Sequence, residues 1–352
     1  MKQLCAGVDV SAATLEVAWR SAGGGVRRRT FSNDAAGHRL LIKELSRGGV
    51  PVRVALEATG LYGLDLALAL DRAKDIEVMV ANPRTIADFG KALLQRSKTD
   101  RIDAETILMF VERMPFVTWN APSKSALQLR AITRRIAALS KIVRAEKTRR
   151  HAGEAAEAVR VILARSTRNT IALLEREITT LRKAARAVIA ADQQLERKLQ
   201  LLTSIKGIGQ VSAVQILAEL ILLPADMTDR QWVAHAGLDP RLVQSGTSVR
   251  LTTRISKQGN PYLRAALYMP AMTASRYESH VAAFRDHLAA RGKRPKQIHV
   301  AVMRKLLHAI HAMFNKDALF EGEKFYRTAA GAAGTLGIAS LAISEVSVPL
   351  TS

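Results

Sequence analysis

The chain has 352 residues, of which 48% are hydrophobic and 24% charged, a composition typical of a folded globular protein with room for two domains. It contains no run of about 18 uncharged apolar residues and no signal-peptide core near its start, so we expect neither a membrane-spanning helix nor export. A single cysteine, Cys5, excludes an internal disulfide and fits a reducing cytoplasm. The formal charge of +22, from 53 basic and 31 acidic residues, indicates a polyanionic partner such as nucleic acid.

The positive charge is distributed unevenly along the chain. Residues 1–122 have a net charge of +3, residues 123–200 of +11 and residues 201–330 of +9. A nearly neutral first third, which retains its carboxylates inside an otherwise basic protein, is typical of an enzyme that holds a metal ion against phosphate. A solvated surface with a bias toward lysine and arginine would account for the same totals.

The first 122 residues alternate between strand and helix patterns. Apolar or alternating runs predict three successive strands, and Asn33 or Asp34 begins a helix that reaches about residue 47. A strand, a helix and a strand follow before the break at Asn82-Pro83. An opening meander followed by alternating elements predicts an α/β domain of the ribonuclease H-like class, since a generic doubly wound domain lacks the meander. The expected strands are 5–10, 14–20, 26–32, 52–57 and 77–80, with the second helix over about 61–73.

The remainder of the chain is predicted to be mostly helical. Residues 123–200 contain almost no glycine or proline and have apolar residues near helical spacing, which predicts a basic coiled-coil arm of two long helices bent near Gly153. Residues 201–327 are expected to form a further domain that opens with a helix pair around residues 207–209 and contains one hydroxyl-rich flexible loop, 244–256. The tail, 328–352, is rich in Ala, Gly and Ser and is expected to be flexible.

Four carboxylates in the first domain stand where a metal site is expected. Asp9 interrupts an apolar strand and Glu57 ends another, which is costly unless something compensates each charge. Asp100 and Asp103 open a helix and share one of its faces. Such oxygen donors suit Mg²⁺ or Mn²⁺, and two such ions stabilise the attacking and leaving oxygens of a phosphoryl transfer. The structural alternatives are an N-cap role for Asp100 and a helix-dipole partner for Asp103.

These segments resemble a known family. Asp9 within Gly-Val-Asp-Val-Ser, Glu57 within Leu-Glu-Ala-Thr-Gly, and the two aspartates of Lys-Thr-Asp-Arg-Ile-Asp-Ala are similar to motifs of the DEDD transposases of bacterial insertion sequences, the one-hundred-and-ten family. The resemblance runs from residue 4 to about residue 320, and no departure touches the four carboxylates. It implies a RuvC-like first domain, a helical arm, a C-terminal transposase domain, and a noncoding bridge RNA that pairs with target and donor DNA. A homo-oligomer, a dimer of dimers, is also implied.

The hydroxyl-rich loop holds the second predicted part of the site. Serine, glycine and threonine in a loop are ordinarily turn formers, but basic neighbours of Ser245 would stabilise charge on a phosphate attacked by its hydroxyl. Matched to the family motif, Ser245 is the residue that forms a covalent phosphoserine with DNA. The helix pair around residue 207 resembles a helix-hairpin-helix, whose glycines let backbone amides approach a phosphate. The expected nucleic-acid contacts are Arg134, Arg135, Arg149, Arg150, Lys206, Gly207, Gly209, Arg250, Arg254 and Lys257.

The leading interpretation is a transposase and DNA recombinase that cuts and rejoins the strands of its own element. Two alternatives stay open. A Holliday-junction-type or structure-specific endonuclease would share the fold and the metal ions, but it would use water and form no covalent adduct. A non-catalytic nucleic-acid-binding scaffold would tolerate replacement of Asp9 or Glu57.

Overall fold

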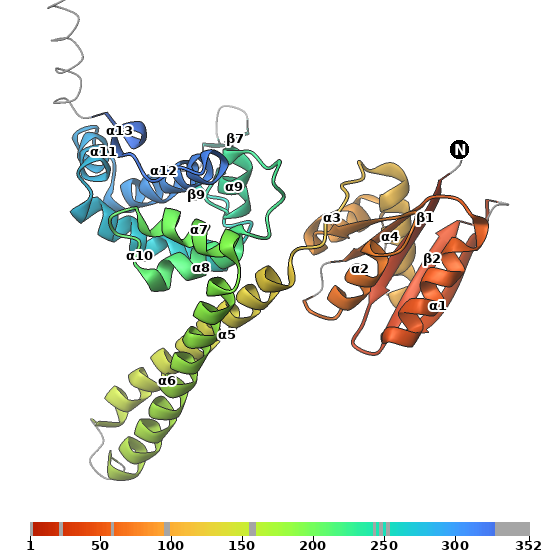
Figure 1. Ribbon diagram of the computed structural model, residues 1–352, viewed down its shortest axis with the longest axis horizontal. Helices are drawn as coiled ribbons and strands as arrows, with labels where there is room; N and C mark the ends of the chain where they lie inside the picture. The colour runs from red at the N-terminus through yellow and green to blue at the C-terminus, as the bar shows by residue number, and fades with distance from the viewer. Residues whose placement is uncertain are drawn as a thin grey trace, which may run out of the picture. The chain divides into compact units, whose positions relative to one another are not determined.

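The computed structural model describes residues 3–20, 24–57, 60–94, 99–154, 160–241, 244–245, 249–250 and 254–327. The tail that is expected to be flexible, 328–352, lies outside these residues. The chain divides into two compact units, Met1–Pro122 and Ser123–Ser352 (Figure 1). None of the described helices is both long and apolar enough to cross a membrane.

A five-stranded sheet forms the centre of the first unit. The strands lie in the order β3-β2-β1-β4-β5, with the β1–β2–β3 meander antiparallel and with β4 and β5 parallel to β1. This mixed sheet confirms the α/β class of the first unit and is consistent with a RuvC-like domain. The strands are β1 (Leu4–Val10), β2 (Thr14–Arg20), β3 (Val26–Ser32), β4 (Val52–Glu57) and β5 (Ile76–Ala81).

Helices cover both faces of this sheet. On one face, Leu41 of α1 and Leu70 of α2 are completely buried against strand residues such as Val8. On the other face, α4 packs mainly against β1 and β2 and also contacts β4, and Ile107 of α4 shares an apolar cluster with Ala55 of β4 and Ile86 of α3. The helices are α1 (Ala35–Leu45), followed by the 3₁₀ turn η1 (Ser46–Gly48), α2 (Leu64–Asp71), α3 (Pro83–Ala92) and α4 (Asp100–Arg113).

Two long helices, α5 (Lys124–Glu154) and α6 (Arg160–Ala190), pack against each other as a hairpin, called the arm below (Figure 1). Their shared core repeats in alternating steps of three and four residues, the spacing that keeps apolar side chains on facing stripes. α5 ends at Glu154, directly after Gly153, near which the sequence predicted the break between the two helices. The core residues are Ile132, Ile136, Leu139 and Val143 of α5 and Ile171, Leu174, Ile178 and Leu181 of α6.

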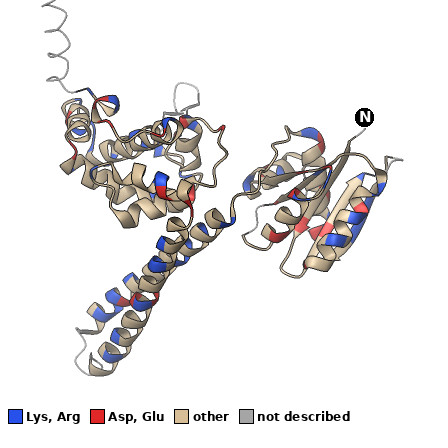
Figure 2. Ribbon diagram, in the orientation of Figure 1, with Lys and Arg blue, Asp and Glu red and all other residues tan. Residues whose placement is uncertain are grey.

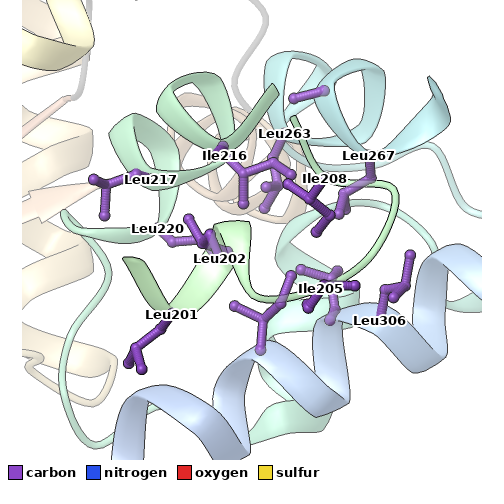
Figure 3. Packing of buried hydrophobic residues seen from close by; sticks show 14 of the residues in the cluster. Leu201, Leu202, Ile205, Ile208, Ile216, Leu217, Leu220, Leu263, Leu267 and Leu306 are labelled. Atoms are coloured by element: carbon purple, nitrogen blue, oxygen red, sulfur yellow. The ribbon is translucent and has the colours of Figure 1, made fainter. Parts of the chain in front are cut away.

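The remaining helices of the second unit form a body around one apolar core. Ile205 and Ile208 of the α7–α8 connection pack with Leu263 and Leu267 of α10 (Figure 3). The base of the arm joins the same core through a few residues, among them Ile189. These helices confirm a mostly helical C-terminal region. They are α7 (Gln193–Thr203), α8 (Gln210–Leu220), α9 (Asp229–His235), α10 (Pro261–Tyr277), α11 (Ser279–Ala290), α12 (Pro295–Lys316) and α13 (Gly322–Phe325).

Short strands occupy the segment that was expected to be a flexible loop. β6 (Pro240–Arg241) pairs antiparallel with β9 (Arg254–Ile255), and β7 (Gln244–Ser245) pairs antiparallel with β8 (Val249–Arg250). We call residues 240–255 the serine hairpin. Val249 and Ile255 favour extended backbone, but the many turn-forming residues in this part of the sequence favour a loop.

Candidate active site

Asp9 and Glu57 stand beside each other on neighbouring strands. The parallel register of β1 and β4 pairs Val8 with Leu56, so the residues that follow them are at the same level of the sheet. Alternation along β1 places Asp9 on the same face as Gly7, and this is the face that α4 covers. The sheet itself therefore brings two of the four carboxylates together.

Gly7 allows α4 to lie directly on β1. A Cβ atom on Gly7 would come within 2.3 Å of the backbone nitrogen of Leu108 and 2.4 Å of the carbonyl oxygen of Ala104. Only a residue without a side chain leaves room for so close an approach. Because Ala104 lies near the start of α4, this contact sets the N-terminal end of the helix, with Asp100 and Asp103, near the Asp9 end of β1.

A separate residue caps the start of α4. Thr99 has an extended backbone, and its hydroxyl accepts a hydrogen bond from the Ile102 N–H at 3.3 Å. Asp100 is therefore the first helical residue and not the N-cap, which removes the structural alternative for this carboxylate. Asp103 stands one turn further on, so both acidic side chains lie at the positive end of the helix dipole.

Ion pairs connect α4 to the meander. Arg20 of β2 donates hydrogen bonds from Nε and Nη2 to the two carboxylate oxygens of Glu112, at 2.7 and 3.0 Å. Arg28 of β3 pairs with Glu105 of α4. These side chains are partly exposed, so each pair contributes little stability, but together they fix the rotation of α4 on the sheet.

Asp9 is electrostatically coupled to the other three carboxylates. Its pKa is raised to about 6, first by burial and then by repulsion from Asp103, Asp100 and Glu57, in that order. A hydrogen bond from the Val10 N–H acts in the opposite direction. A cation placed between these groups would relieve the repulsion and favour the charged form of Asp9.

The donor set of this carboxylate site suits a divalent cation that prefers oxygen ligands. All four side chains are carboxylates, which favours Mg²⁺ or Mn²⁺ over softer metals. Among the described residues, no three carboxylate, imidazole or thiol groups stand close enough to one point to bind a metal ion in the geometry observed. Like charges repel, so the carboxylates are expected to close into a coordination shell only around the ion.

The serine hairpin is anchored where it leaves the body. Ser256 donates hydrogen bonds to Asp239, from Oγ to the carboxylate at 2.5 Å and from N–H to the carbonyl oxygen at 2.8 Å. A Cβ atom on Gly259, whose φ is +154°, would lie 2.2 Å from the carbonyl oxygen of His235, so the return of the hairpin is packed tightly against α9. The backbone of Ser245 pairs with that of Val249, and the Ser245 side chain lies outside the described residues.

Predicted nucleic-acid contacts around the hairpin are only partly described. Arg254 and Lys257 are exposed beside β9, and Lys257 has a positive φ of 53°. The side chain of Arg250, like that of Ser245, lies outside the described residues. The two exposed cations are in a position to meet an anionic ligand at the base of the hairpin.

The basic residues predicted on the arm fall into two groups. Arg135, Arg149 and Arg150 are exposed on α5, where Lys and Arg predominate along both arm helices (Figure 2). Arg134 instead donates two hydrogen bonds of 2.9 Å to Glu219 of α8, which is only 4% exposed. Glu219 compensates the charge of Arg134 within the protein, which gives this arginine a structural role, and its contact with nucleic acid stays a prediction.

The two glycines of the α7–α8 connection have different surroundings. A Cβ atom on Gly207, where φ is +113°, would lie 2.4 Å from the backbone nitrogen of Ala274 in α10. Gly209 precedes the first residue of α8, is exposed, and has open space around its Cβ position. Lys206 is also exposed. Approach of a phosphate is therefore open at Gly209, whereas Gly207 serves the packing of the connection on α10.

The sequence analysis did not single out Gly7, Glu219 or Asn260. Asn260 donates from Nδ2 to Glu219 at 2.6 Å, and its Oδ1 caps α10 by accepting from the N–H of Tyr262 and Leu263. Signals for all three were present. A glycine inside a strand, a glutamate inside an apolar helical run, and asparagine before a proline each indicate a special position.

Comparison with known proteins agrees with this architecture. Residues 6–152 match the model of the DEDD transposase of IS110, and residues 199–286 match the model described as transposase of the IS116/IS110/IS902 family, together more than half of the chain. The chain is also 28% identical over 298 residues to the pilin gene-inverting proteins of Moraxella bovis and Moraxella lacunata, an overlap of 83% of this chain and 90% of each relative. The carboxylate site and the α7–α8 connection both fall within the matched segments. The chain belongs to the IS110 family of transposases, enzymes that act on DNA.

Proposed function

We propose that this transposase cuts and rejoins the DNA of its insertion sequence by metal-dependent transesterification, with the Ser245 hydroxyl as nucleophile. The observation that best supports the metal half is the coupling of Asp9 to three other carboxylates, which contributes to a pKa of about 6. Relatives named as pilin gene-inverting proteins support the rejoining half, because inverting a gene requires that strands be cut and joined again.

The proposed step conserves phosphodiester bonds. The Oγ of Ser245 attacks a DNA phosphorus, the bond from phosphorus to a deoxyribose oxygen breaks, the serine loses its proton and the leaving oxygen gains one. In the second step a hydroxyl of another strand displaces the serine, so no external energy source is needed. The exposed Arg254 and Lys257 would stabilise negative charge as it develops on the phosphate.

The proposed cation is Mg²⁺ or Mn²⁺. Asp9, Glu57, Asp100 and Asp103 would hold it, and when bound it would polarise the phosphate and favour loss of the serine proton. A Holliday-junction-type endonuclease would need the same carboxylates but not Ser245.

The decisive experiment looks for a covalent protein–DNA product on a denaturing gel. We expect the wild-type protein with Mg²⁺ to form an adduct that disappears in Ser245→Ala, while Ser248→Ala keeps substantial activity as the matched control. Free DNA ends without an adduct from the wild type, or an adduct from Ser245→Ala, would replace the serine mechanism by the water-using nuclease.

We also propose that a noncoding bridge RNA guides the reaction to target and donor DNA, and that the protein acts as a dimer of dimers. The charge of +11 on residues 123–200 supports binding of a polyanion, and joining two duplexes needs several active sites. Sequencing of the nucleic acid that co-purifies with the protein is expected to give one discrete RNA. Recovery of random cellular RNA would contradict the proposed guide RNA. A mass of one protein chain in the complex, measured by light scattering, would contradict the proposed oligomer.

A further inference from the structure

A cleft of about 620 Å³ lies between the arm and the helices α8 and α10. Side chains of α5 and α6 form one wall, including Thr133, Arg144 and Arg182, and Gln215 of α8 and Tyr262 of α10 form the other. The lining is a mixture of polar and apolar groups and is not acidic overall, and Tyr262 keeps 41% of its surface exposed. A cavity of this volume holds a molecule of drug size, roughly one or two nucleotides, and it is too small for a duplex.

The cleft retains positive charge that no acidic side chain neutralises. Its two glutamates are already paired, Glu219 with Arg134 at 2.9 Å and Glu175 with Lys147 at 2.7 Å. Arg144 and Arg182 are exposed, and no carboxylate within the described ranges forms an ion pair with either. Two arginines that face one cavity without counterions are suited to phosphate.

The cleft continues toward the start of α8. A second cavity of about 90 Å³ shares Thr133, Arg182 and Gln215 with the first and extends to Gln210 and Val211. These are the first residues of an 11-residue helix, whose initial backbone N–H groups have no partner within the helix. The open space at the neighbouring Gly209 leaves this helix end accessible.

We propose that this cleft binds the phosphodiester backbone of a single nucleic-acid strand. Arg144 and Arg182 would each contact a phosphate, the start of α8 would hold a further one, and the exposed ring of Tyr262 would offer a base a surface for stacking. This inference rests on the proposed function, because an enzyme that exchanges strands must hold at least one strand unpaired.

The test measures binding without any cleavage. Full-length protein is titrated in EDTA with fluorescent oligothymidylate, oligouridylate and a DNA duplex, and anisotropy gives the affinity over a range of salt. In the double variant Arg144→Ala, Arg182→Ala we expect single-strand affinity to fall about tenfold and the slope of log K against log salt to shrink by about 1.4, since each phosphate contact adds about 0.7. The matched control Arg176→Ala, Lys183→Ala removes the same charge from exposed positions that do not line the cleft.

A second variant tests the cleft without changing the charge of the protein, so that long-range electrostatics cannot explain a loss of binding. Ala265 is exposed and lines the cleft, so Ala265→Trp should fill it and weaken strand binding, whereas Ala289→Trp on α11 should not.

Equal losses for both oligonucleotides support backbone recognition, and a loss for only one of them identifies that nucleic acid as the occupant. The proposal is overturned if the control double variant loses as much affinity, if duplex binding falls as much as single-strand binding, or if Ala265→Trp binds normally. None of these results depends on Ser245 or on bound metal, so failure of the cleft and failure of the serine mechanism are distinguishable.

Discussion

The backbone nitrogen of Leu108 lies 2.3 Å from the point that a Cβ atom on Gly7 would occupy, so the position of α4 depends on the absence of a side chain in β1. We therefore expect Gly7→Ala to lower the free energy of unfolding of the first unit by about 1–3 kcal/mol, because the helix must move off the sheet. Movement of α4 also displaces Asp100 and Asp103, so affinity for Mn²⁺ should fall.

Urea denaturation and calorimetric titration of Mn²⁺ measure these two effects. Gly48→Ala is the control, because a Cβ atom there meets only the Val50 side chain at an ordinary 3.6 Å. Unchanged stability and metal affinity in Gly7→Ala would show that α4 is free to shift.

The raised pKa of Asp9 gives the metal-free protein a specific dependence on pH. Because its folded-state pKa is about 6 against an ordinary 3.8, the folded protein holds this proton more tightly than the unfolded chain does. The corresponding stability is fully present below pH 3.8 and is lost as pH rises through about 6. A cation must displace the same proton below about pH 6, so metal affinity should fall there.

Unfolding and Mn²⁺ titrations across this range, for wild type and Asp9→Asn, isolate the contribution of this one group. The difference in stability between the two proteins should change with pH as described. A difference that does not vary with pH would contradict the assigned pKa.

Replacement of any one of the four carboxylates by alanine should abolish strand cleavage and leave the fold intact. Removing one negative charge from Asp9, Glu57, Asp100 and Asp103 relieves repulsion, so the metal-free variants should be at least as stable as the wild type. Circular dichroism and cleavage assays with Mg²⁺ check both parts, with Asp71→Ala on the exposed end of α2 as the control. Wild-type recombination by Asp9→Asn at ordinary Mg²⁺ concentration would remove the metal assignment.

The pair formed by Arg134 and Glu219 should be costly to break and inexpensive to replace as a whole. Glu219→Ala leaves the half-buried guanidinium and Asn260 Nδ2 without their acceptor, and since Arg134 is 40% exposed to water we expect a loss of about 1–3 kcal/mol. The apolar double variant Arg134→Met, Glu219→Leu should recover most of this stability. Asn260 caps α10 shortly after the serine hairpin and loses its acceptor, Glu219, in the double variant. The double variant should therefore form the DNA adduct more slowly than the wild type, even where its stability is restored.

Chemical denaturation and single-turnover adduct assays separate stability from positioning. If the double variant is as unstable as Glu219→Ala, the loss arises from packing and not from an unpaired charge. Normal adduct formation by the stable double variant would show that the pair does not position the hairpin.

The two glycines of the α7–α8 connection are expected to respond differently to alanine. Gly207→Ala places a Cβ atom 2.4 Å from the backbone of Ala274 at a φ of +113°, so it should destabilise the second unit. Gly209→Ala should fold normally but weaken DNA binding, because its methyl group would stand at the open start of α8. Thermal unfolding and anisotropy on each variant distinguish the two roles, and identical behaviour of both would contradict the assignment.

The sequence predicted best where a repeating pattern determines the structure. The apolar residues of β1 and β2 and the three- and four-residue steps of the arm correspond to surfaces that are buried in the observed fold, so the pattern was sufficient. The surroundings of isolated residues could not be predicted in the same way. The role of Arg134 depends on Glu219, which is distant in sequence, and no local pattern around an arginine indicates whether a buried acid faces it.

Two-residue strands were beyond the reach of pattern analysis. A pair such as β7 and β8 has too few positions to show alternation, and its pairing depends on the chain being held at Asp239 and Ser256. The contact of Gly7 with α4 was missed for a related reason. The contact depends on the absence of a side chain at Gly7 and on a helix, α4, that lies about 100 residues further along the chain.

The apolar core of the arm has a consequence for how the protein can vary in size. It repeats with a period of seven residues, and among the described residues it meets the core of the body near the base of the arm, through Leu129, Ile132, Ala185, Val188 and Ile189. Insertion or deletion of one heptad in each of α5 and α6 would therefore keep every facing pair in register and leave the body unchanged. Each such step would move the tip by about 10 Å, since a helix rises 1.5 Å per residue. The arm is in this sense a spacer of adjustable length, with a reach that can change independently of the chemistry elsewhere in the chain.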